Sequence, residues 1–355
     1  RFLKAQAAHQ HQQRQGTPAR PEAASWFVFG PTFEGGARTW KNVQNLPELN
    51  LEHKPVREHL WLARDSVVRS YLRDGADGWR LDTAYELGPK FLSELTRAAH
   101  AEKPGSLVVG EIVNHPSGWM PAMDAVMNFH WRTTMLKLVT GELDGPTASR
   151  LFEQTVQDVG IEPLLKSWVL LDNHDVQRVA TEIPDEHRRR LAQVLQFTLP
   201  GSPNLYYGAE VGMTGGWDPA QRGPMRWDLV ATGHPELQWT QALIKLRHQH
   251  RALRVGDFRR LHSQRLLAFE RHTQRVGDTV IVVMNPSNAP VRETLALRNG
   301  MLMDDSALID VLSATSPIKI GAGFITVELP PWGWRVLKPE QPDAQSGYSV
   351  YKRVP

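Results

Sequence analysis

Acidic residues follow three apolar stretches that are typical of buried strands. Asp82 closes the stretch 79–82, Glu111 closes 107–111, and Asp175 follows 168–172. If these strands are parallel neighbours in an α/β barrel, their carboxyl ends open on one face, so the three acids are expected to converge there. Two carboxyl groups on a neutral substrate suit cleavage of a glycosidic bond. One attacks as an ionised nucleophile, and the other acts first as acid and then as base.

The residues around these acids fit such a division of roles. Arg80 lies two positions before Asp82 and is expected on the same face of the strand, where a guanidinium lowers the pKa of the carboxyl group. Apolar neighbours on both sides of Glu111 are expected to raise its pKa, as a general acid requires. His174 and Asp175 are placed to bind hydroxyls and to stabilise positive charge that develops at the reacting carbon.

The elements that must position these residues alternate between strand and helix. Helical spacing of apolar residues predicts helices at about 55–71, 91–98, 146–158, 185–198 and 235–251. Continuous apolar runs predict strands at 79–82, 107–111, 125–128, 168–172 and 204–207. This alternation indicates a parallel sheet covered by helices. Near residue 253 the pattern changes to short strands separated by Gly, Pro and Asn, at 266–271, 279–285, 291–297, 324–329 and 334–337, which indicates an antiparallel β domain.

Three segments carry a resemblance to a known family. Asp77–Asp82, Gly110–Ile112 and Leu171–Asp175 resemble the second, third and fourth signature regions of the α-amylase family of glycoside hydrolases. The resemblance implies that Asp82 is the nucleophile, Glu111 the general acid/base and Asp175 the transition-state stabiliser. It also implies that Arg80 and His174 bind the glucose unit that is cleaved.

Further motifs narrow the resemblance to one branch. Glu86 and the segments 46–50 and 124–128 are similar to the neopullulanase, cyclomaltodextrinase and maltogenic amylase branch, although Leu46 and Glu48 stand where that branch usually has methionine and lysine. Glu86 is therefore expected to bind substrate. Trp119 follows Glu111 in a strand-end loop and is expected either to stack on a pyranose ring or to pack in the local core.

The family's first signature region does not occur in this sequence. The stretch before Trp79 is too short for three strand–helix units of about 30 residues each. We therefore expect an N-terminally truncated chain that holds strands four to eight of a (β/α)8 TIM barrel and an antiparallel β-sandwich. The expected domains are a remnant of the excursion after strand three at 1–50, a partial barrel at 51–252, the β domain at 253–340 and a tail at 341–355. An open barrel is expected to be poorly stable and poorly active.

Composition excludes several other classes. The 355 residues carry 41 Lys and Arg against 38 Asp and Glu, a net charge of +3 that does not indicate a nucleic-acid partner. With no cysteine, the chain has no thiolate nucleophile and no cysteine-bound metal. Membrane-spanning runs, phosphate loops and dinucleotide motifs are absent from the sequence. No cofactor and no metal site are expected, and calcium enters only because many members of the wider family bind it.

The reaction expected from the resemblance is retaining hydrolysis of α-glucosidic bonds in maltooligosaccharides, cyclodextrins or related α-glucans. Two alternatives stay open. One is another reaction of the same family, such as that of an α-glucosidase, a trehalose synthase or a sucrose-active transglycosylase. The other is a catalytically incompetent fragment. The expected partner is the α-glucan substrate, with a homodimer formed by a longer protein. The sequence decides neither α-1,4 versus α-1,6 preference nor whether the location is cytoplasmic, periplasmic or secreted.

Overall fold

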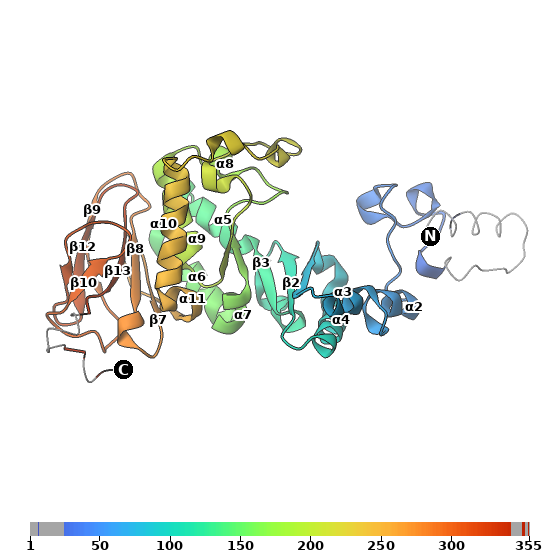
Figure 1. The fold of residues 1–355 in the computed structure, drawn as a ribbon, viewed down its shortest axis with the longest axis horizontal. Helices are drawn as coiled ribbons and strands as arrows, with labels where there is room; N and C mark the ends of the chain where they lie inside the picture. Colours follow the sequence, from blue (N-terminus) through green and yellow to red (C-terminus); the bar gives the residue numbers. More distant parts are fainter. Residues whose placement is uncertain (1–5, 7–24, 342–349, 352–353, 355) are drawn as a thin grey trace, which may run out of the picture. The chain divides into compact units, whose positions relative to one another are not determined.

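The computed structural model describes residue 6 and residues 25–341, 350–351 and 354 (Figure 1). Residues 1–5 and 7–24 of the expected 1–50 remnant, and most of the expected tail, lie outside the described residues. The chain divides into two units: Arg1–Leu81 with Glu86–Val108, and Asp82–Tyr85 with Val109–Pro355. The four domains expected from the sequence, with their three boundaries, stay predictions.

The first unit combines a small irregular segment with a helical one. Residues 25–50 form turns joined by isolated antiparallel bridges, among them Phe27 with Leu49 and Thr39 with Pro47. The regular elements of this unit, in chain order, are η2 (Glu34–Gly36), η3 (Trp40–Asn42), α2 (Lys54–Arg57), η4 (Glu58–Leu62), α3 (Val67–Arg73), β1 (Gly78–Leu81) and α4 (Gly88–Glu102).

The helix expected over 55–71 is wrong in its continuity. The chain forms α2, the π-helical η4 and α3, and it leaves the helical conformation at Ala63. Trp61 is buried, whereas Tyr71 is 60% exposed although the expected helix buried it. The indole N–H of Trp61 donates to the Glu94 carboxylate of α4 at 2.8 Å, and Arg57 donates to the same oxygen at 2.9 Å. These contacts with α4 anchor η4 and override the local helical period.

Five strands form the parallel sheet in the order β1-β2-β3-β4-β5. Strand β2 (Leu107–Ile112) begins in the first unit and continues into the second, where it pairs with β3 (Ala125–Asn128), followed by β4 (Trp168–Leu170) and β5 (Ser202–Asn204). The close pairing of β1 with β2 requires Gly78, because a Cβ there would lie 2.0 Å from the Leu107 carbonyl oxygen. Sheet order and direction therefore agree with the sequence expectation.

The last strand of this sheet lies earlier in the chain than expected. It ends at Asn204, whereas the sequence pattern placed it at 204–207. Trp168 pairs with Ser202 and Leu170 with Asn204, so the strand already spans the length of β4 before the tyrosines are reached. Those tyrosines belong instead to the loop beyond the strand.

Helices of the second unit contribute buried side chains to one large apolar core, together with strands β7 (Leu267–His272) and β8 (Val280–Met284); Figure 1 shows where these helices lie. Those that follow β3 are α5 (Phe129–Thr140), α6 (Gly145–Val159), α7 (Ile161–Lys166), α8 (Val179–Glu182), α9 (Glu186–Thr198), α10 (Pro235–Gln249) and α11 (Arg251–Val255). Short turns of this unit are η5 (Ala84–Leu87), which runs on into the first unit, and η6 (Pro116–Gly118), η7 (Met120–Ala122), η8 (Ala209–Val211), η9 (Ala220–Arg222) and η10 (Trp227–Leu229).

Helix α5 was not expected from the sequence. It begins at the cap residue Asn128, whose side chain accepts from the Trp131 N–H at 3.0 Å, and ends at Gly141 in the left-handed region. Most of its side chains are buried all round, so the chain offers no amphipathic period by which sequence reasoning would recognise it.

The C-terminal β domain consists of two facing antiparallel sheets. The larger has the order β11-β10-β13-β8-β7-β6, and the smaller pairs β12 with β9. Strands β7 (Leu267–His272), β8 (Val280–Met284), β9 (Val291–Ala296), β12 (Phe324–Leu329) and β13 (Trp334–Pro339) agree with the expected strands. Three strands and one turn were missed: β6 (Asp257–Arg260), β10 (Ala307–Asp310), β11 (Ile318–Lys319) and η11 (Val276–Asp278). A second apolar core lies between the sheets, which makes the domain a sandwich.

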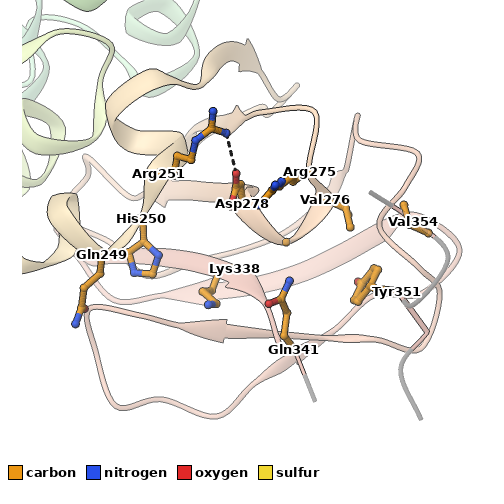
Figure 2. Close-up of a pocket in the computed structure, with 11 residues that line it drawn as sticks. Gln249, His250, Arg251, Arg275, Val276, Asp278, Lys338, Gln341, Tyr351 and Val354 are labelled. Atoms are coloured by element: carbon orange, nitrogen blue, oxygen red, sulfur yellow. Dashed lines mark hydrogen bonds and ion pairs between the residues drawn. The ribbon is translucent and has the colours of Figure 1, made fainter. Parts of the chain in front are cut away.

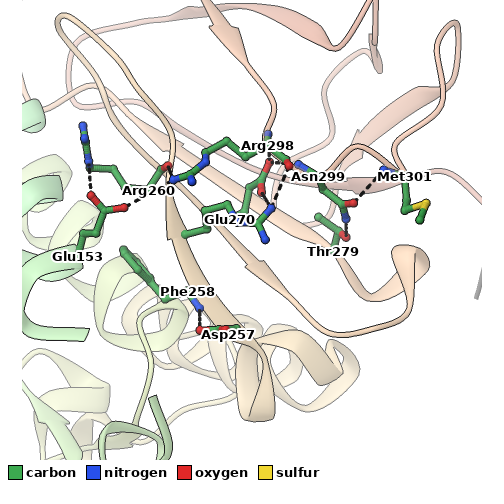
Figure 3. Close-up of polar contacts among 10 residues, drawn as sticks. Glu153, Asp257, Phe258, Arg260, Glu270, Thr279, Arg298, Asn299 and Met301 are labelled. Carbon is green, nitrogen blue, oxygen red and sulfur yellow. Dashed lines mark hydrogen bonds and ion pairs between the residues drawn. The ribbon is translucent and has the colours of Figure 1, made fainter. Parts of the chain in front are cut away.

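Helix α6 joins the barrel segment to this sandwich (Figure 3). A Cβ on Gly145 would lie 2.6 Å from the Leu267 nitrogen, so the helix approaches β7 as closely as only glycine allows. Glu153 of α6 binds Arg260 of β6 at 2.9 Å. Glu270 of β7 is fully buried, and it accepts from the Arg298 N–H at 2.9 Å. Burial raises the pKa of Glu270.

Candidate active site

Asp82 and Glu111 lie in the second unit, at the ends of the first two strands of the sheet. Asp82 directly follows β1 and is exposed, whereas Glu111 belongs to β2 and is only 9% exposed. The backbone N–H of Thr83 donates to Glu111 Oε2 at 3.0 Å. Thr83 has φ +38°, a value that is rare for a β-branched residue and persists only where the surroundings enforce it. The residue after Asp82 is thus fixed against the Glu111 carboxylate.

Gly110 leaves the space that this arrangement needs. A Cβ at this position would lie 2.3 Å from Met123 Sδ and 2.9 Å from Ala84 Cβ. Ala84 is fully buried and begins η5, directly after Thr83. Glycine before Glu111 therefore lets the chain segment that carries Asp82 and Thr83 pack directly on β2.

The loop after β4 presents His174 and Asp175 together. His174 Nε2 lies 3.1 Å from Asp175 Oδ2, and Arg222 Nη2 donates to Asp175 Oδ1 at 3.2 Å. Arg222 Nε also pairs with Asp218 at 2.8 Å. One guanidinium thus links the Asp175 loop to the segment beyond β5, and both carboxylate oxygens of Asp175 have a basic neighbour.

Two buried amides hold this loop in place, and sequence reasoning missed the second. Asn173 is 3% exposed, and its Oδ1 accepts from the Asp175 N–H at 2.9 Å. Gln221 is 1% exposed, and its Nε2 donates to the His174 carbonyl at 2.9 Å. The Asn-x-Asp spacing of the first contact is a recognisable local turn. Gln221 carries no such signal, because it contacts a residue far away in the sequence.

Arg178 joins the β4 loop to the β5 loop. Its side chain is fully buried, and Nη1 donates to the Tyr207 carbonyl at 2.6 Å. The guanidinium lies over the rings of Tyr206 and Tyr207, 4.6 and 4.7 Å from their centroids. Burial, followed by the neighbouring Tyr207, raises the pKa of Tyr206 to about 12. Stacking on a cation explains why the tyrosines leave the strand expected for them.

Asp172 is a further acid of the site region that sequence reasoning left without a role. Its side chain is 2% exposed and accepts from the Val179 N–H at 2.8 Å, at the start of α8. Burial raises the pKa of Asp172 to about 6, against the opposing effects of that N–H and of Arg178 and Arg132. Arg132 also binds the Leu171 carbonyl and the Glu182 carboxylate. The Asp172 carboxyl group therefore ties the β4 loop to α8.

The raised pKa of Asp172 predicts a pH-dependent stability. In the folded state the Asp172 carboxyl group keeps its proton up to about pH 6, whereas the ordinary pKa of an aspartate is 3.8. The contribution of this carboxyl group is therefore full below about pH 4 and is lost as the pH rises through about 6. From pH 4 to 7 the free energy of unfolding of Asp172→Asn should rise relative to the wild type by roughly 3 kcal/mol. Denaturant titrations across this range measure the difference. A difference between Asp172→Asn and the wild type that stays constant with pH would contradict the prediction.

The other predicted site residues are Arg80, Glu86 and Trp119. Arg80 lies in β1, and exposed Glu86 accepts from the Trp40 indole N–H at 2.7 Å; both belong to the first unit. Trp119 is half-buried between η6 and η7, and among the described residues no aromatic ring packs against it. Their substrate-binding roles stay predictions. Among the described residues, no three acidic or histidine side chains are grouped to hold a metal ion.

Comparison with known families decides the classification. A model of the alpha amylase catalytic domain matches residues 8–257, and a model of the maltogenic amylase C-terminal domain matches residues 258–336. The chain belongs to the α-amylase family of glycoside hydrolases. The fold is therefore that of a TIM-barrel catalytic segment followed by the C-terminal β-sandwich, as the sequence predicted.

Individual relatives place the chain in the expected branch. It is 34% identical to a cyclomaltodextrinase of a Bacillus species over 263 residues, which cover 72% of this chain and 46% of the relative. It is also 34% identical to neopullulanase 2 of Thermoactinomyces vulgaris over 271 residues, 72% of this chain and 44% of the relative. A solved cyclomaltodextrinase superposes with a TM-score of 0.77 at 28% identity, over 93% of this chain and 57% of that one. The chain thus spans less than half the length of these two curated relatives.

No helix in the part of the chain that the structure describes is long and apolar enough to cross a bilayer.

Proposed function

We propose that this α-amylase family member hydrolyses α-glucosidic bonds of maltooligosaccharides, cyclodextrins or related α-glucans with retention of configuration. The hydrogen bond from the Thr83 N–H to Glu111 Oε2 carries the proposal, because it brings the chain next to Asp82 up to the Glu111 carboxylate. Retaining glycosidases need two such carboxyl groups close together. Kinship with a cyclomaltodextrinase and a neopullulanase supports the choice of α-glucans.

In the proposed reaction Asp82 is the nucleophile and Glu111 the acid/base. A carboxylate oxygen of Asp82 attacks the anomeric carbon while Glu111 gives its proton to the departing glycosidic oxygen, which leaves as a sugar hydroxyl. Water then attacks the glycosyl ester, loses a proton to Glu111 and releases the free carboxylate of Asp82. Asp82 is exposed, so a substrate can reach it, and Glu111 is buried beside it against the Thr83 N–H.

Asp175 and His174 complete the proposed site. Positive charge develops on the sugar ring as the bond breaks, and a carboxylate oriented beforehand stabilises that charge. Asp175 is held by Arg222 and by the Asn173 turn, so its position is set before substrate binds. His174, whose Nε2 lies 3.1 Å from Asp175 Oδ2, is placed beside it to bind a sugar hydroxyl.

The stereochemistry of the first product tests this proposal. The protein is incubated separately with a maltooligosaccharide, a cyclodextrin, pullulan and sucrose, and proton NMR follows the anomeric signals before mutarotation. Retaining hydrolysis should release the α-anomer first from at least one of the three glucans. Early appearance of the β-anomer would overturn the mechanism. Conversion of sucrose alone would replace the proposed substrate class with a sucrose-active reaction of the same family.

A further inference from the structure

A polar pocket of about 290 Å³ lies in the second unit, away from the acids described above (Figure 2). It is bounded by the junction of α10 and α11, the turn η11 and the end of β13. Its size is at the lower end of the range for small-molecule sites. The side chains that carry its chemistry are those of Gln249, His250, Arg251, Arg275, Asp278, Lys338 and Gln341.

The pocket has an excess of positive charge. Of the described residues that line it, Arg251, Arg275 and Lys338 carry permanent positive charges and Asp278 carries the one carboxylate. That carboxylate is already engaged, because Arg251 Nη1 pairs with Asp278 Oδ2 at 3.2 Å and Thr273 Oγ1 donates to the same oxygen at 2.8 Å. Among the described lining residues, no second carboxylate accompanies the other two cations.

The unmatched cations are Arg275 and Lys338. Neither side chain has a hydrogen-bond or ion-pair partner among the residues that the structure describes, although both line the pocket. His250 lies close enough to Lys338 to feel its charge: burial, followed by that charge, lowers the pKa of His250. A positive potential is therefore concentrated on this side of the hollow.

The neighbouring hollow provides an internal contrast. It shares Arg251 and Arg275 with the pocket but is also lined by Glu162 and Asp257, so its charges balance. The pocket adds Lys338 to the same two guanidiniums and has Asp278 as its described carboxylate, so its excess of positive charge is the larger of the two. A small anion is therefore favoured in the pocket of Figure 2 and not in the adjoining one.

We propose that this pocket binds the phosphate group of a small phosphorylated molecule. A guanidinium matches two phosphate oxygens with paired N–H groups, and an ammonium adds a compact charge, so Arg275 and Lys338 form a complementary pair of donors. The amides of Gln249 and Gln341 stand at the same pocket and supply donors and acceptors for hydroxyl groups. Free phosphate and a phosphate monoester share the recognised group, and the remaining volume and the two amides favour the monoester.

Calorimetric titration at constant ionic strength tests the proposal, with inorganic phosphate, glucose 6-phosphate and glucose as probes. Both phosphates should bind and glucose should not. Tighter binding of glucose 6-phosphate would identify a monoester site, and equal affinities would identify a site for phosphate itself. Arg275→Gln and Lys338→Gln should each weaken phosphate binding by about tenfold, the effect of one charge-assisted contact.

Matched changes elsewhere in the β domain separate pocket binding from general attraction to a basic protein. Arg265→Gln and Lys319→Gln remove exposed cations outside this pocket and should leave the affinity unchanged. Thermal unfolding without phosphate checks that all four variants are folded. The proposal is overturned if neither phosphate binds at 10 mM, a level that corresponds to roughly −3 kcal/mol. It is equally overturned if the two control variants weaken binding as much as the pocket variants.

Discussion

Asp82→Asn is expected to lower kcat for α-glucan hydrolysis by roughly a thousandfold or more, because the proposed covalent intermediate cannot form without the carboxylate. Glu111→Gln should cause a loss of similar size on natural substrates, whose leaving group needs a proton. Steady-state rates on a maltooligosaccharide measure both. The effect concerns chemistry and not folding, since asparagine and glutamine keep the size of the side chains they replace.

The two roles can be separated with an aryl α-maltoside whose leaving group is a good anion. Such a substrate needs little protonation, so Glu111→Gln should form the glycosyl–enzyme rapidly and then stall, because water has no base to activate it. Azide needs no base, so it should accelerate turnover of Glu111→Gln on this substrate. Asp82→Asn should show neither the initial burst nor this acceleration.

An exposed carboxylate of the β domain supplies the control. Glu328 lies in β12, and Glu328→Gln should keep wild-type rates on every substrate. Retention of most activity by Asp82→Asn would remove it as the nucleophile. A Glu111→Gln variant that loses as much on the activated substrate as on the natural one, with no response to azide, would remove Glu111 as the acid/base.

Arg271→Met is expected to destabilise the second unit by roughly 3–5 kcal/mol. The guanidinium is fully buried and donates to the carbonyls of Thr198 at 2.7 Å, Gly256 at 2.8 Å, Asp257 at 3.2 Å and Leu253 at 3.3 Å. Burial lowers the pKa of Arg271 to about 9, so the side chain remains charged at neutral pH. Methionine fills a similar volume but leaves these carbonyls without their donor, and each unsatisfied buried group costs about 1–3 kcal/mol.

The expected loss follows from where these carbonyls lie. They belong to the last turns of α9 and α11 and to the first residue of β6. One side chain therefore donates hydrogen bonds to the carboxyl ends of two helices and to the first strand of the sandwich. Denaturant unfolding should show a lower midpoint for Arg271→Met, whereas Arg292→Met, at an exposed position of β9, should match the wild type. Arg271→Lys keeps the charge but not the fork of donors and should fall between them. An unchanged midpoint in Arg271→Met would show that the carbonyls find other donors.

The sequence by itself determined the alternation of strand and helix, the change to an antiparallel β domain and the choice of three candidate acids. Continuous apolar runs located β2, β3 and β4, and the acids at 82, 111 and 175 were chosen because they follow strand ends; their convergence on one face stays a prediction. Strands of the sandwich that alternate buried and exposed residues, such as β12, were equally visible. These features are local: a strand or helix must satisfy its own backbone and display its own apolar face.

Tertiary structure alone decided which residues become buried and what holds them. The break before α3 depends on Trp61 and Arg57 meeting Glu94, and the early end of β5 depends on its register with β4 and on Arg178 drawing the tyrosines away. Asp172 and Arg271 look like ordinary surface residues in the sequence. Both are buried because the folded chain supplies hydrogen bonds to them, from the Val179 N–H at the start of α8 to Asp172 and from Arg271 to carbonyls such as that of Thr198, and such partners offset the cost of burying a polar group. Neither hydrophobic periodicity nor a sequence motif identifies those partners, so the burial of these two side chains could be found only from the folded structure.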